Sequence, residues 1–277
     1  MADEETKING NGYDDDDRNG ALNRFRSATS VSMSPELFEK LYLSPQNKIK
    51  GDLRRTFANP TPIPIAGFVL SLTPLSMDLM GWRGAGGNGA ASIPVYFFQG
   101  GVLMTVGAIL EWILGNTFPA VVFSVFGTFW LSYGGVLNPD FAAFASYAPT
   151  DATSPAQGLT TPGFNASIAY WFLFMGLICF VFLICSLRTN VAFFVIFLSL
   201  VIAFGLITGA FLLNAADITG NANQAHKLLV GAGAATFVTS MAGWYILLAL
   251  LLAAVDFPIQ IPVGDLSTTV KGKSDRR

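Results

Sequence analysis

Six long uncharged runs constrain the fold of this chain more than any other feature of its sequence. Between successive Asp, Glu, Lys and Arg residues lie uncharged runs at 56–77, 84–110, 112–139, 152–187, 189–216 and 228–255. A helix of about 20 mostly apolar residues crosses the roughly 30 Å hydrocarbon core of a bilayer, and each run supplies that length. The runs are continuously apolar, which disfavours a β-barrel, where apolar and polar residues alternate. The sequence therefore predicts an all-α membrane protein with a bundle of six transmembrane helices.

The composition agrees with a membrane protein and gives no sign of enzyme chemistry. The 277 residues are 52% hydrophobic and only 12% charged, and the charges gather mainly at the two ends of the chain. The sequence has no nucleotide-binding loop, catalytic triad or ligand-spaced His/Cys cluster. We therefore expect no enzymatic activity, no cofactor, no metal site and no nucleic-acid partner.

The basic residues predict the orientation in the membrane. If both termini are cytoplasmic, 14 of the 16 Lys and Arg residues fall inside, and only Arg83 and Lys227 fall outside. Basic residues near membrane spans favour the cytoplasmic side. The longest outer loop, 140–165, has acids and no Lys or Arg, which agrees with this topology. We expect a multi-pass protein of the plasma membrane.

The chain divides into a core and two tails. Residues 1–45 are polar, include an acidic run at 14–17 and lack the apolar region of a signal peptide, so we expect a disordered cytosolic tail. Residues 46–257 form the transmembrane domain, and 258–277 a cytosolic C-terminal tail. Within the domain we expect helices near 64–81, 93–114, 118–138, 167–187, 190–213 and 228–255.

Prolines crowd the start of the first span, in the stretch NPTPIPIAGF. If Asn59 is the helix cap, Pro60 and Pro62 lie in the first turn, where no backbone N–H has an intrahelical partner. The missing N–H of Pro64 would then leave the Pro60 carbonyl without a donor at the membrane boundary. The segment is either a rigid wedge or a vestibule whose irregular backbone lines a solute path.

Two acidic residues adjoin the apolar spans, and each has a structural and a functional interpretation. A carboxylate at mid-bilayer costs about 2.5–3.5 kcal/mol, so it needs a polar partner, a water-filled cavity or a proton. Glu111 either reaches the nearby interface or handles protons or substrate during transport. Asp78, beside Gly81 and Arg83, either ends the first span at the surface or takes part in transport.

Polar and aromatic residues within the spans are candidates for a solute path. Phe126, Phe129, Trp130 and Tyr133 recur at helical spacing in the third span, where they either pack or narrow a pore beside Gly127. No Lys or Arg lies centrally in a span to hold a bare anion, so its charge would have to be met by helix ends, by hydroxyl groups or by protonation. These hydroxyl candidates are Thr73, Thr105, Ser124 and Thr208.

Three further features have open interpretations. Gly100, Gly107 and Gly233 belong to small-residue faces that join helices either within one subunit or between subunits. His226, the only histidine, either lies unused at an outer helix end or senses pH. Asn165 begins an N-glycosylation sequon that lies close to the fourth span.

Three motifs together resemble those of the acetate uptake transporter family, the succinate-acetate permease group of fungi and bacteria. NPTPIPIAGF (59–68) is similar to its proline signature, ILEWILGNTF (109–118) to its Glu-containing end of span two, and FGTFWLSYG (126–134) to its aromatic segment. The resemblance covers about residues 55–255.

The resemblance implies a six-helix subunit that assembles as a hexamer, with a pore for small monocarboxylates in each subunit. It implies proton coupling, and ammonium export in some fungal relatives. The family's constriction maps by motif position onto Phe68, Phe126 and Leu200. This chain departs from the family pattern at Pro64-Ile65, which replaces Gly-Leu, and at Phe126, which replaces a Tyr and removes a hydroxyl.

We therefore predict a transporter or channel for acetate or a similar small monocarboxylate, moving with a proton. Glu111 is the predicted proton-coupling or gating group, and Phe68, Phe126 and Leu200 form the constriction. Carrying the acid with its proton avoids most of the desolvation cost of a bare anion. Ammonia or ammonium passage and a non-transporting sensor or scaffold are the alternatives.

Overall fold

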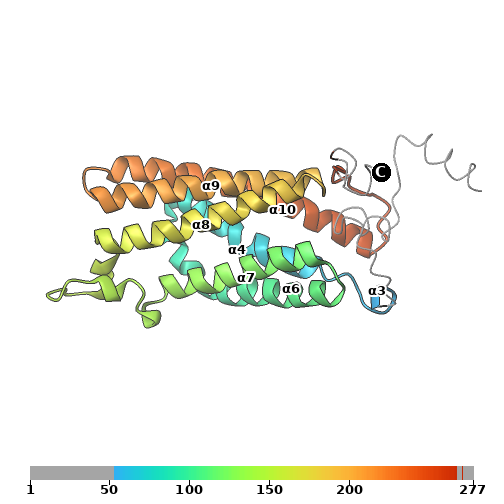
Figure 1. The fold of residues 1–277 in the computed structure, drawn as a ribbon, viewed down its shortest axis with the longest axis horizontal. Coiled ribbons are helices and arrows are strands. Elements are labelled where there is room, and N and C mark those ends of the chain that lie inside the picture. The colour runs from blue at the N-terminus through green and yellow to red at the C-terminus, as the bar shows by residue number, and fades with distance from the viewer. Residues whose placement is uncertain (1–52, 267–269, 271–277) are drawn as a thin grey trace, which may run out of the picture. The chain divides into compact units, whose positions relative to one another are not determined.

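The structure is a computed structural model that describes residues 53–266 and 270. The predicted N-terminal tail, 1–45, lies outside the described residues, as do 267–269 and 271–277. The described part is a bundle of helices (Figure 1), and it contains no β-strand beyond an isolated bridge between Asn190 and Asp265. The predicted all-α class is confirmed.

Within the described residues, six helical segments are long and apolar enough to span a membrane, which confirms the six predicted spans. They are α4 Pro62–Met80; a second span made of α5 Ile93–Val95, the π-helical η3 Tyr96–Leu103 and α6 Met104–Ile113; α7 Thr117–Leu137; α8 Pro162–Ser186; α9 Val191–Ala216; and α10 Ala222–Ala254. The short helices are α3 Leu53–Thr56, η1 Trp82–Gly84, η2 Gly87–Ser92, η4 Pro139–Phe141, η5 Ala145–Tyr147 and η6 Pro155–Thr160.

Helices α8 and α10 begin earlier than predicted, because polar composition suggested loops where their first turns lie. In α8 the Thr161 hydroxyl accepts a hydrogen bond from the Phe164 N–H at 3.4 Å, and Pro162 occupies the first turn. Helix α10 has no side-chain cap, but the turn before it is closed by Asp217 Oδ1, which accepts from the Gly220 and Thr219 N–H groups at 2.9 and 3.1 Å.

Side chains close the bundle around an apolar interior. Helix α4 contacts α10, η3 and α6; α6 contacts α7; and α9 contacts both α8 and α10. Helix α7 reaches α8 through Phe126 and Phe182, whose ring centroids are 6.3 Å apart, and reaches α9 through Phe129 and Phe204 at 5.7 Å. The space between α4, α7 and α9 is therefore bounded mainly by aromatic and aliphatic groups.

Two glycines show that small-residue faces join helices within this chain. A Cβ atom added to Gly107 of α6 would lie 2.5 Å from the Pro64 ring of α4. One added to Gly233 of α10 would lie 2.9 Å from the Ser76 carbonyl of α4. Such close backbone approach strengthens helix packing in lipid, where the hydrophobic effect does not drive association.

Part of the predicted C-terminal tail packs against the bundle. The Val191 N–H donates to the Gly264 carbonyl at 2.9 Å, and the Leu266 N–H donates to the Thr189 carbonyl at 3.0 Å. Val263, directly before Gly264, is 3% exposed. The described end of the tail therefore covers the turn between α8 and α9.

Candidate functional site

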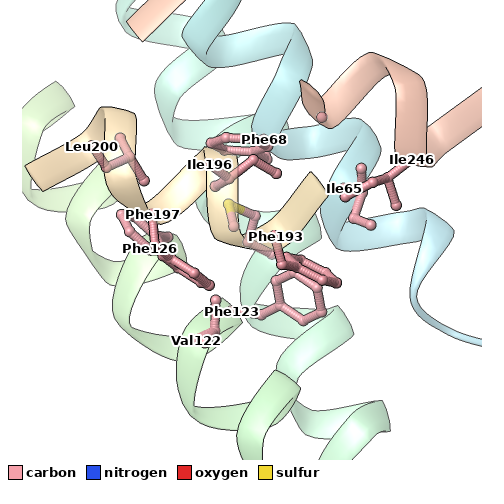
Figure 2. Close-up of a pocket in the computed structure, with 12 residues that line it drawn as sticks. Ile65, Phe68, Val122, Phe123, Phe126, Phe193, Ile196, Phe197, Leu200 and Ile246 are labelled. Atoms are coloured by element: carbon pink, nitrogen blue, oxygen red, sulfur yellow. The ribbon is translucent and has the colours of Figure 1, made fainter. Parts of the chain in front are cut away.

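An apolar cavity lies inside the bundle between α4, α7 and α9 (Figure 2). Its volume is about 30 Å³, enough for about one or two water molecules but too small for an acid with four non-hydrogen atoms. No lining residue carries a polar side chain. The lining residues are Ile65, Phe68, Met104, Val122, Phe123, Phe126, Phe193, Ile196, Phe197, Leu200, Gly243 and Ile246.

The structure brings the three predicted constriction residues together in this cavity. Phe68 comes from α4, Phe126 from α7 and Leu200 from α9, and they are 8%, 5% and 3% exposed. Figure 2 shows their side chains gathered from three helices around one space. This geometry is what a closed constriction requires, although their role in transport stays a prediction.

A second, smaller cavity adjoins the first toward the start of α7. Its volume is about 10 Å³, and it shares Val122, Phe123, Phe193 and Phe197 with the larger cavity. Thr189, at the turn between α8 and α9, also lines it. The two small spaces therefore share one aromatic wall that leads toward the end of the bundle where α7 and α9 begin.

Glu111 is buried within a polar cluster and does not reach the surface. Its side chain is 0% exposed; Oε1 accepts from the Thr61 hydroxyl, and Oε2 accepts from the Asn116 side-chain amide at 2.5 Å. The Asn116 N–H also donates to the Glu111 carbonyl at 2.8 Å. We call Thr61, Glu111 and Asn116 the polar corner. It joins the start of α4, the end of α6 and the start of α7, and Glu111 does not line the cavity.

The proline segment differs from the prediction at its cap. Helix α4 begins after Thr61, and Asn59 Oδ1 instead accepts from the Thr61 N–H at 3.0 Å. The Pro60 carbonyl accepts from the Ile63 N–H at 3.0 Å, so the predicted acceptor without a donor does not exist. A tighter i to i+3 hydrogen bond at the helix start replaces the one that Pro64 cannot make. Pro62 is half-buried in the first turn, and the segment resembles the rigid wedge more than a vestibule.

The four hydroxyl candidates do not gather at the cavity, within the part of the chain that the structure describes. The Thr73 hydroxyl donates to the Val69 carbonyl at 2.6 Å and accepts from Trp244 Nε1 at 3.0 Å. Ser124 is exposed on the outer face of α7. Thr105 and Thr208 have hydroxyl oxygens buried without a hydrogen-bond partner among the described residues.

The remaining aromatics of the third span pack against neighbouring helices. Phe129 lies against Trp171 and Phe204, with ring centroids 5.3 and 5.7 Å away. Trp130 stacks on Tyr96 at 5.1 Å, and the Tyr133 hydroxyl donates to the Asn88 carbonyl at 2.7 Å. These contacts are typical of packing and place the three rings outside the cavity lining.

The other polar candidates lie outside the cavity. Asp78 is half-buried near the end of α4, and His226 is exposed in the second turn of α10. Asn165 of the sequon is 2% exposed, and its side-chain amide donates to the Leu159 and Thr161 carbonyls at 2.8 and 2.9 Å. Glycosylation of Asn165 would require this helix start to open. Among the described residues, no cluster of three His, Cys, Asp or Glu could hold a metal ion.

Sequence reasoning missed most of the cavity wall. Phe193, Ile196 and Phe197 line it together with Leu200, and their spacing places all four on one face of α9. That spacing is visible in the sequence. Because α9 is apolar on every side, however, the pattern does not tell which face points inward.

The chain matches a known protein family over most of its length. The sequence profile described as the GPR1/FUN34/yaaH family matches residues 42–268. The chain is 46% identical to the protein alcS of Aspergillus fumigatus over 241 residues, 86% of each chain. It is 29% identical to the acetate permease A of Emericella nidulans over 222 residues, 80% of this chain and 71% of that one. It is 28% identical to the ammonia transport outward protein 3 of Saccharomyces cerevisiae over 191 residues, 68% and 61% of the two chains.

A solved structure shares the fold. The bacterial acetate channel SatP superposes with a TM-score of 0.58 at 20% sequence identity, and the match covers 75% of this chain and 99% of that one. At this identity the similarity concerns the arrangement of the helices. The six-helix bundle is therefore a known membrane architecture.

Proposed function

Because this chain belongs to the GPR1/FUN34/yaaH family, as the resemblance predicted, we propose that it carries acetate or a similar small monocarboxylate across a membrane. The solute path runs between α4, α7 and α9. The observation that carries the proposal is a buried cavity without a polar side chain, lined by Phe68, Phe126 and Leu200.

The apolar lining requires that the acid crosses without its charge. A bare carboxylate loses its hydration in such a site and gains no compensating hydrogen bond, which makes its transfer very unfavourable. Protonation removes most of this cost. Since carboxyl groups have pKa values of about 4, the protonated fraction rises steeply as the pH falls toward that value. Transport is therefore coupled to a proton.

The constriction opens by side-chain movement. The cavity of about 30 Å³ does not accommodate acetic acid as it stands, so Phe68, Phe126 and Leu200 move aside as the acid passes. Glu111 acts in gating, because the polar corner fixes the start of α4 relative to α6 and α7. The helix that carries Phe68 is thereby held at one end.

The same proposal includes the orientation of the subunit, the membrane in which it lies and its assembly. Both termini face the cytoplasm, the membrane is the plasma membrane, and six copies assemble with one path each. The charge distribution supports the orientation, and large exposed apolar side chains such as Phe98, Trp112 and Phe174 provide surface for lipid or neighbouring subunits. Labelling of single engineered cysteines in the tails tests the orientation, and native mass spectrometry tests the hexamer.

Ammonia passage is the second candidate, and the size of the cavity favours it. Ammonia has one non-hydrogen atom, as water does, so it fits a space of about 30 Å³ without any side-chain movement. An apolar lining also admits the neutral molecule. Ammonium flux without acetate flux supports this candidate over the first.

Uptake of labelled acetate into proteoliposomes, at external pH values of about 5 and about 7, tests the function. Proton-coupled transport of the acid predicts faster uptake at the lower pH. Leu200→Ala widens the constriction and raises uptake of butyrate relative to acetate. Leu198→Ala, on the exposed side of the same helix, is the matched control and leaves this ratio unchanged. If neither acetate nor ammonium moves, the protein is a sensor or scaffold.

A further inference from the structure

Two buried hydrogen-bond donors next to the constriction lack partners among the described residues. The indole Nε1 of Trp130 and the hydroxyl of Ser71 have none, and the two residues are 1% and 0% exposed. Buried polar groups are nearly always paired with protein, water or ligand. A pair of free donors inside a membrane bundle therefore indicates that something else binds there.

Both residues pack against Gly100 of the second span. A Cβ atom added to Gly100 would lie 2.6 Å from Cγ of Trp130 and 2.7 Å from Oγ of Ser71. Gly100 belongs to the π-helical η3, and such segments occur frequently at functional sites. Trp130 is held in place by the Tyr96 ring stacked on it. The Trp130 donor is thus fixed before a ligand arrives.

The two donors lie one helical turn beyond the constriction residues. Ser71 lies three residues after Phe68 on α4, and Trp130 lies four residues after Phe126 on α7, so each shares a helix face with a constriction residue. Helices α4 and α7 run in the same direction, because both begin at the polar corner. The two donors are therefore about 4.5–6 Å beyond the constriction along the helices.

We propose that Ser71 and Trp130 form a subsite on the outer side of the constriction that binds a carboxyl oxygen of the acid before it passes inward. This inference rests on the proposed transport of monocarboxylates and names the residues that recognise them. An indole N–H only donates, so its partner must be an acceptor: a carboxyl group offers two oxygens, neutral ammonia a single lone pair and an ammonium ion none. A site built around such hydrogen bonds discriminates between solutes more strongly than apolar contacts do.

Trp130→Phe is the direct test, because it keeps a ring at this position and removes the N–H. We expect the KM for acetate uptake to rise roughly tenfold, with little change in methylammonium uptake. Trp244→Phe is the matched control, because it removes an indole N–H that already has a partner, Thr73, and it leaves the acetate KM unchanged. Ser71→Ala gives the same direction of change if Trp130→Phe does not fold.

The outcomes separate this inference from the function on which it rests. The subsite is wrong if the wild-type protein takes up acetate and both Trp130→Phe and Ser71→Ala keep an acetate KM within twofold of wild type. Water alone then pairs with the donors, and the proposed function stands. Equal loss of acetate and methylammonium uptake also overturns the subsite. No acetate uptake by the wild-type protein overturns both.

Discussion

The polar corner and the apolar cavity are both buried and share helices α4 and α7, yet only the polar corner contains polar side chains. At the polar corner, both carboxyl oxygens of Glu111 accept hydrogen bonds, from Thr61 and Asn116. The cavity a few turns away has no polar side chain in its lining. A buried charge is tolerated where hydrogen bonds replace its hydration, and is excluded where they do not.

This difference assigns separate tasks to the two regions. The polar corner joins the ends of three helices. In the function proposed above, the cavity leaves only uncharged solutes a favourable passage. The following changes test this division of tasks, from the largest expected effect to the smallest.

Removing the carboxylate is expected to have the largest effect. Glu111→Ala leaves the Thr61 hydroxyl and the Asn116 amide without this buried acceptor, which lowers the free energy of unfolding by roughly 2–5 kcal/mol. Urea unfolding of the purified protein in detergent micelles measures this loss. Glu111→Gln keeps the shape of the side chain, so we expect it to unfold at a higher urea concentration than Glu111→Ala. It still lowers acid-driven acetate uptake. Wild-type stability of Glu111→Ala contradicts the structural role, and wild-type uptake by Glu111→Gln removes the residue from the mechanism.

The close approach of α4 and α6 beside the polar corner is tested by Gly107→Ala. The added methyl group meets the Pro64 ring, so the helices must separate, at a cost of about 1–3 kcal/mol in unfolding free energy. Gly205→Ala on α9 is the matched control, because no atom lies within 4 Å of its added Cβ, and we expect no loss of stability. Equal stability of the two variants contradicts the close packing.

A hydroxyl placed in the cavity tests whether the cavity is dry. Phe126→Tyr introduces a donor without a partner and lowers the unfolding free energy by about 1–2 kcal/mol. The same hydroxyl offers the acid a hydrogen bond, so the acetate KM falls. Phe174→Tyr, with a ring that is 64% exposed, is the control and changes neither quantity. If Phe126→Tyr is as stable as wild type and keeps its KM, the lining is not apolar in solution.

The smallest effect concerns a charge outside the membrane spans. The N–H of Gly220, followed by the hydroxyl and N–H of Thr219, holds the pKa of the Asp217 carboxyl below its usual value. A lowered pKa in the folded state contributes stability above about pH 4, and this is lost as the pH falls through the lowered pKa. The thermal midpoint of wild type therefore exceeds that of Asp217→Ala at neutral pH, and the gap narrows in acid. A gap that does not depend on pH contradicts this role of the carboxylate.

The sequence singled out Glu111, and the family resemblance singled out Phe68, Phe126 and Leu200, but neither identified the residues that surround them. Glu111 is visible as an acid beside an apolar run, whereas its partner Thr61 lies 50 residues away along the chain. Ser124 is predicted from its hydroxyl to line a solute path. In the structure it is exposed, because α7 turns its aromatic residues inward. Ser71 and Trp130 lie 59 residues apart in the sequence, and only the packing of both against Gly100 of a third helix brings them together.

By itself, the sequence determined six helices and their place in a membrane. The length of each apolar run and the need to pair every backbone N–H and C=O in lipid depend only on that stretch of chain. Its motifs also determined the family. Only the tertiary structure decided which face of each helix points inward, since nearly every face of these spans is apolar and helix packing in lipid depends on shape. The same packing brought Thr61 and Asn116 to Glu111 from other elements, whereas Ser71 and Trp130 meet no hydrogen-bond partner among the described residues.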